Sequence, residues 1–81
     1  MEFPTEEIRG FDSPLQYRQF AQMVADCLMA GTAIEVEADP AYVVGDIVGG
    51  RWFKDTGTGR IWRLVGPVEP FPGVWEQVYV A

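Results

Sequence analysis

Three groups of residues have the types and spacing that chemistry or binding requires, and the first is acidic. Glu35, Glu37 and Asp39 alternate with apolar residues, and Asp46 follows after a short apolar stretch. Carboxylates are the ligands that hard cations prefer, but this spacing does not match a calcium-binding loop. We therefore interpret the four acids as a solvated face or as a surface that attracts a basic partner.

The second group interleaves basic and aromatic side chains. A surface of this kind can stack nucleic-acid bases and neutralise phosphates. Residues 1–50, however, contain nine acids and two bases, a net charge of −7, which leaves a weak electrostatic footprint for nucleic acid. We expect a structural hairpin before a nucleic-acid surface. The basic members of the group are Arg51, Lys54, Arg60 and Arg63, and its tryptophans are Trp52 and Trp62.

Several residue types that enzymes use are missing from the chain. There is no histidine and no asparagine, and Ser13 and Cys27 are the only serine and cysteine. One chain therefore cannot form a Ser-His-Asp or Cys-His arrangement, nor a zinc site of cysteine and histidine. We expect a protein that is not an enzyme, with no catalytic residue, no metal and no cofactor.

The third group, Asp55-Thr56-Gly57-Thr58, resembles the short motif of the aspartic proteases. Small retroviral-type members act as homodimers in which each chain gives one aspartate, so the resemblance implies a catalytic Asp55. Leu64-Val65-Gly66 is similar to the second signature of that family. It follows much too closely, and Lys54 stands where an apolar residue normally leads into the aspartate. We therefore expect Asp55 to open a turn by bonding its own backbone, with the glycines allowing the chain to reverse.

The elements that must position these groups begin with a helix over residues 13–30. Ser13 is a good N-cap, Pro14 suits the first helical position, Gln16 completes a capping-box pattern and Gly31 is a natural stop. Apolar residues recur within this stretch at helical spacing. Residues 1–12 lack periodicity and predict an arm that Phe3, Ile8 and Phe11 attach to the core.

Residues 33–80 predict an antiparallel β region with a proline-rich loop at 66–73. Strands are expected at 33–38, 42–48, 51–55, 60–65 and 74–80. The fold class is thus α+β, a single domain over residues 1–81, with the N-terminal helix packed on a curled sheet of four to five short strands. Val44-Gly45-Asp46-Ile47-Val48 resembles the strand-entry turn of SH3-like barrels, which leaves a closed barrel as an alternative.

Composition points to the cytoplasm. The single cysteine fits a reducing compartment, the N-terminus does not resemble a signal peptide, and no apolar run is long enough to cross a membrane. The net charge of −6 disfavours a phosphate backbone as a ligand and favours a basic protein surface. The oligomeric state stays open.

We expect a small acidic interaction protein that occupies a basic surface on a protein partner. Its acidic patch would be Glu35, Glu37, Asp39 and Asp46, with Trp62 or Trp75 as an apolar anchor if either is exposed. Small phage-type inhibitors, including anti-CRISPR proteins and nucleic-acid mimics, are similar in size and charge. The alternatives are a nucleic-acid-binding module that uses the basic hairpin, and a structural subunit whose sheet edges pair with neighbours.

Overall fold

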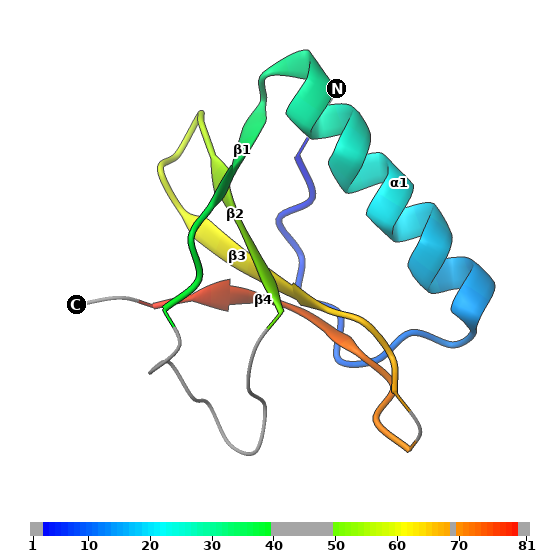
Figure 1. The fold of residues 1–81 in the computed structure, drawn as a ribbon. Helices are drawn as coiled ribbons and strands as arrows, with labels where there is room; N and C mark the ends of the chain where they lie inside the picture. Colours follow the sequence, from blue (N-terminus) through cyan, green and yellow to red (C-terminus); the bar gives the residue numbers. More distant parts are fainter. Residues whose placement is uncertain (1–2, 40–49, 69, 80–81) are drawn as a thin grey trace.

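The computed structural model describes residues 3–39, 50–68 and 70–79, which form one helix and four strands. These are α1 (Pro14–Ala30), β1 (Ala33–Val36), β2 (Arg51–Asp55), β3 (Ile61–Val65) and β4 (Val74–Val78). All neighbouring strands are antiparallel, in the order β1-β2-β3-β4, and α1 lies on one side of the sheet (Figure 1). The predicted α+β fold, a helix on a curled antiparallel sheet, is confirmed.

The sheet that the described residues form does not close into a barrel, so the closed-barrel alternative is wrong for this part of the chain. The outer edge of β4 is taken by the N-terminal arm, where the Ile8 N–H donates to the Trp75 carbonyl at 2.8 Å and the Trp75 N–H donates back at 3.0 Å. With that edge occupied, β4 does not pair with β1. The expected strand at 42–48, and the turn that carried the barrel resemblance, lie outside the described residues.

Helix α1 has the ends that its sequence predicts. The Ser13 hydroxyl accepts a hydrogen bond from the Gln16 N–H at 3.1 Å, and the Gln16 side chain accepts one from the Asp12 N–H. In the usual capping box the side chain of Gln16 would accept from the N–H of the N-cap residue, Ser13, whereas here it accepts from the N–H of the residue before the N-cap. At the other end, Gly31 adopts a left-handed conformation with φ 81°, and its N–H returns to the helix carbonyls.

The predicted arm is attached through the three residues expected to hold it. Phe3 and Phe11 are buried, and Ile8 packs against the same core. Phe3 contacts the rings of Trp62 and Trp75, with centroids 6.4 and 5.6 Å away. The arm therefore lies between α1 and β4 and closes one side of the core (Figure 1).

Aromatic rings dominate the core between α1 and the sheet. Trp62 and Trp75 stack with centroids 5.4 Å apart, and Phe20 meets Trp75 edge-on at 5.1 Å. Trp62 is 2% exposed and Trp75 0%, so the expectation that one of them is an exposed anchor is not met. Strand alternation places both on the face that α1 covers, and burying two indoles is the largest apolar gain available there.

Candidate functional site

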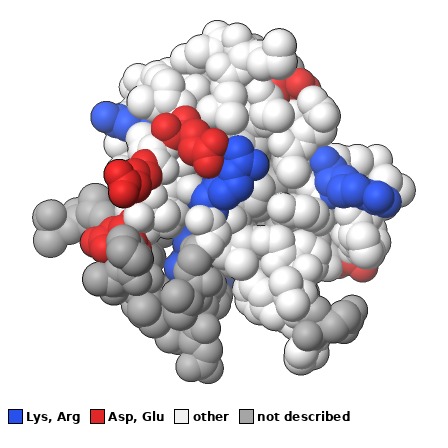
Figure 2. Space-filling model, in the orientation of Figure 1, with Lys and Arg blue, Asp and Glu red and all other residues white. Residues whose placement is uncertain are grey.

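The acidic residues that the structure describes follow β1 and the segment directly after it. Glu35, Glu37 and Asp39 are exposed, and the apolar residues between them, Val36 and Ala38, are half-buried. Figure 2 shows acidic side chains gathered along this course, with basic side chains beside one end of the row. The expected exposure of these three acids is observed, but the expected buried face is not, because Ile34 is 48% exposed and Ala33, on the acidic face, is buried. Asp46, the fourth predicted acid, lies outside the described residues.

Glu35 is held by Arg51, the first residue of the neighbouring strand. The Arg51 guanidinium donates to both carboxylate oxygens, at 2.9 and 2.8 Å. These hydrogen bonds lower the pKa of Glu35, and partial burial opposes the shift. The same contact raises the pKa of Arg51. Both side chains remain largely in water, so the pair orients Glu35 more than it stabilises the fold.

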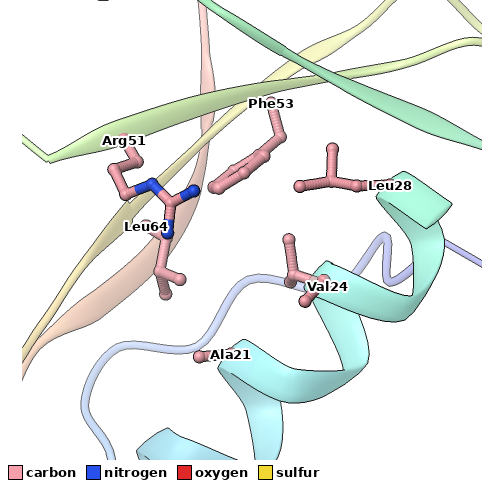
Figure 3. A pocket seen from close by; sticks show the side chains of 7 residues that line it. Ala21, Val24, Leu28, Arg51, Phe53 and Leu64 are labelled. Carbon is pink, nitrogen blue, oxygen red and sulfur yellow. The ribbon is translucent and has the colours of Figure 1, made fainter.

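Arg51 also borders a small hollow between α1 and the sheet. Its guanidinium carbon lies 5.2 Å from the centroid of the Phe53 ring, over which it stacks. The hollow holds about 30 Å³ and is lined by Val24, Leu28 and Leu64 in addition to these two residues (Figure 3). A space of this size fits about one water molecule, so it is too small to bind an organic ligand.

The four basic residues of the hairpin do not form one surface. Arg63 is completely buried and forms an ion pair with Glu76, and Arg51 is engaged by Glu35. Lys54 and Arg60 are the exposed members that form no ion pair with an acid in the described ranges. Arg63 therefore cannot contact nucleic acid in this fold, because strand alternation turns its side chain onto the buried sheet face opposite α1.

Asp55 occupies the turn as predicted. One carboxylate oxygen accepts the Gly57 N–H at 2.9 Å and the other accepts the Thr58 hydroxyl at 3.0 Å. The Asp55 carbonyl also accepts the Gly59 N–H, at 2.7 Å. Both carboxylate oxygens thus serve the reversal of the chain, which is the behaviour of an Asx turn.

Sequence reasoning missed two features that matter for binding. The first is Glu76, which pairs with Arg63 on the buried face and is approached by Arg9 from the arm at 3.9 Å. Its signal was the register of a hairpin with strands at 60–65 and 74–80, which sets these two residues opposite each other. The second is Ile34, which is 48% exposed on β1. This residue lies on β1, which is at the edge of the described sheet, a position that sequence reasoning did not establish.

Neither a metal centre nor a membrane-spanning helix is found in the part of the chain that the structure describes. Within it, no three acidic or cysteine side chains converge as metal ligands would, and α1 is not apolar and long enough to cross a bilayer. Comparison of the chain with protein-family models, with curated proteins and with solved structures gives no match.

Proposed function

We propose that this protein is a non-enzymatic interaction protein that binds a basic surface of a protein partner through the acidic residues of β1 and the segment after it. The observation that carries the proposal is the exposure of Glu35 on β1 and of Glu37 and Asp39 in the segment directly after it. Exposed charges of one sign steer a complementary partner and select against partners of like charge.

The ion pairs that the basic residues form within the molecule support a basic protein, rather than a nucleic acid, as the partner. Arg9, Arg51 and Arg63 form ion pairs with Glu7, Glu35 and Glu76, so half of the bases already neutralise acids within the molecule. No basic side chain among the described residues forms an ion pair with Glu37. A partner that supplies lysine or arginine would find this carboxylate accessible, whereas a nucleic-acid backbone would be repelled.

The apolar part of the proposed binding surface differs from the one that the sequence predicted. With Trp62 and Trp75 in the core, the apolar contact must come from residues that the fold exposes near the acids, of which Ile34 is one. The finer parts of the proposal are that the partner is cytoplasmic and that the protein inhibits it, as small acidic phage-type inhibitors do. Identification of the partner would test both.

Charge reversal with a matched control tests the proposal. Tagged protein is used to retain partners from nuclease-treated lysate, with Glu37→Lys compared with Glu6→Lys, an exposed acid on the arm. Both variants change the net charge equally, so a general electrostatic effect would weaken both. We expect Glu37→Lys to reduce retention of a basic partner about tenfold at low salt, and Glu6→Lys to leave it nearly unchanged.

Equal loss in the two variants, or no loss in either, would contradict a binding role for this surface. Recovery of nucleic acid from lysate without nuclease, reduced by Lys54→Ala and Arg60→Ala, would instead favour the hairpin as a nucleic-acid-binding surface.

A further inference from the structure

The backbone of β1 presents hydrogen-bonding groups away from the rest of the described sheet. In the β2–β3 hairpin, the Asp55 N–H donates to the Arg60 carbonyl at 2.8 Å, so the backbone groups of Asp55 are directed towards β3. Backbone groups alternate sides along a strand, so those of Lys54 and Trp52 are directed towards β1. The bond from the Thr56 N–H to the Thr32 carbonyl, at 3.1 Å, follows the same alternation.

The residues of β1 that receive these groups can be read from the register. Lys54 lies opposite Ile34, and Trp52 lies opposite Val36. Ile34 and Val36 therefore exchange hydrogen bonds with β2, and the N–H and C=O groups of Ala33 and Glu35 are directed outward. Within the described ranges β1 pairs with β2 alone, so these outward groups lie on a sheet edge.

The side chains along this edge differ between its two faces. Ile34 and Val36 lie on the face opposite α1, where Ile34 is 48% exposed. Glu35 lies on the other face, beside Arg51, and Glu37 follows immediately after the strand. A strand added to this edge would thus meet apolar side chains on one face and carboxylates on the other.

From this arrangement we infer that the β1 edge binds an extended segment of the partner by strand addition, and that the segment alternates basic and apolar residues. Main-chain hydrogen bonds to Ala33 and Glu35 would supply the pairing. Basic side chains would lie beside Glu35 and Glu37, and apolar side chains would pack on Ile34 and Val36. The inference rests on the proposed function and adds to it the mode of binding and the pattern of the partner segment.

Charge complementarity selects this occupant over a second copy of the chain. Two β1 strands paired edge to edge would bring acidic side chains of one copy against those of the other, and like charges across a strand pair are destabilising. Inward or flanking charges are a common way for edge strands to avoid such self-pairing. The same acids attract a basic strand. They therefore disfavour pairing of β1 with a second copy of the chain and favour its pairing with a basic segment of a partner.

A peptide of seven residues that alternates lysine and valine is a suitable probe. Its comparison peptide has the same sequence with N-methyl groups on alternate backbone amides, which keeps the charge and removes strand pairing. Binding is measured by isothermal titration at low salt, with wild-type protein and two variants. Glu35→Pro removes the outward N–H and the carboxylate, whereas Glu35→Ala removes the carboxylate alone.

We expect the lysine-valine peptide to bind and its N-methylated form to bind at least tenfold more weakly. Glu35→Pro should lower the affinity about tenfold further than Glu35→Ala does, with thermal melts showing that both variants are folded. Ile34→Pro serves as the contrasting variant, because it removes a hydrogen bond to β2 and should lower stability instead.

The outcomes separate the inference from the proposed function. Equal binding of the two peptides, weakened by Glu37→Lys, would overturn strand addition and leave the acidic surface as the binding site. Absence of binding by the lysine-valine peptide would overturn strand addition, while the charge-reversal experiment with lysate would still decide the proposed function. Sedimentation showing a dimer that Glu35→Pro dissociates would assign the edge to a second copy and overturn the basic occupant.

Discussion

The ion pair between Arg63 and Glu76 should be among the most sensitive features of the fold. The two residues lie directly opposite each other on β3 and β4, and their side chains are 0% and 6% exposed. The change Glu76→Gln would keep the size of the side chain and remove its charge. It would leave the buried Arg63 guanidinium without its carboxylate.

The expected loss follows from that burial. Removing one partner of a buried ion pair costs about 3–5 kcal/mol, because the remaining charge stays in a poorly solvated site. The free energy of unfolding of a chain this long is about 4–12 kcal/mol. The variant should therefore lose about a quarter or more of its stability, and the midpoint of thermal unfolding should fall by more than about 10 °C.

Urea denaturation followed by circular dichroism measures the change. The double variant Arg63→Met/Glu76→Leu removes both charges and replaces them with apolar volume, so its free energy of unfolding should return to within about 1 kcal/mol of wild type. Arg9→Ala is the control, because Arg9 is mostly exposed and contacts Glu76 only at 3.9 Å. It should cost less than about 1 kcal/mol.

A loss of stability in Glu76→Gln no larger than that in Arg9→Ala would contradict the predicted effect of burial. That result would mean that the pair behaves as a solvated surface pair. The prediction also affects tests of nucleic-acid binding. Replacing Arg63 alone would weaken binding indirectly by destabilising the fold, so Lys54 and Arg60 are the informative positions.

Three further changes have defined outcomes. Asp55→Ala should lower the free energy of unfolding, measured in urea, by about 2–4 kcal/mol, because two hydrogen bonds to the carboxylate are lost. Asp55→Asn should lower it by about half as much. An unchanged midpoint of unfolding in both variants would contradict the role of Asp55 in the turn. Ser13→Ala should cost about 1 kcal/mol in a thermal melt, since the Gln16 N–H loses its acceptor, and a cost near zero would mean that water replaces the cap. For Glu35 the pKa is lowered in the folded state, so its stabilising contribution is present above about pH 4.5 and is lost as the pH falls through the folded-state pKa. Glu35→Gln should remove this dependence of stability on pH, which amounts to less than about 1 kcal/mol for an exposed pair. The same profile of stability against pH in wild type and variant would contradict the prediction.

Local signals account for the parts of the fold that sequence predicted well. The caps of α1 depend on residues within one turn of each end, and the turn at Asp55 depends on residues within the turn itself. Such contacts do not require knowledge of the rest of the chain. The positions of β1 and β4 were likewise readable from their patterns of period two, but the faces that they bury were not, since Ile34 is exposed and β4 is buried on both faces.

The parts that sequence could not settle depend on contacts between distant segments. Alternation shows that Trp62 and Arg63 lie on opposite faces of β3, but not that both faces are buried at this strand. Trp62 therefore looked like a candidate anchor and Arg63 like a candidate phosphate ligand. Similarly, the exposure of Ile34 depends on β1 lying at the edge of the described sheet, which follows from the strand order.

The pairing of Ile8 with Trp75 joins segments separated by nearly the whole chain, and this has a consequence for synthesis of the protein. Ribosomes add about 5–20 residues per second, so the arm emerges several seconds before the strand that it pairs with. During that interval Phe3, Ile8 and Phe11 have no β4 to cover, although α1 and the β2–β3 hairpin can already form from local contacts. The arm is thus made before β4 but can reach its place only after β4 is made, so Ile8 stays without its strand partner for that interval.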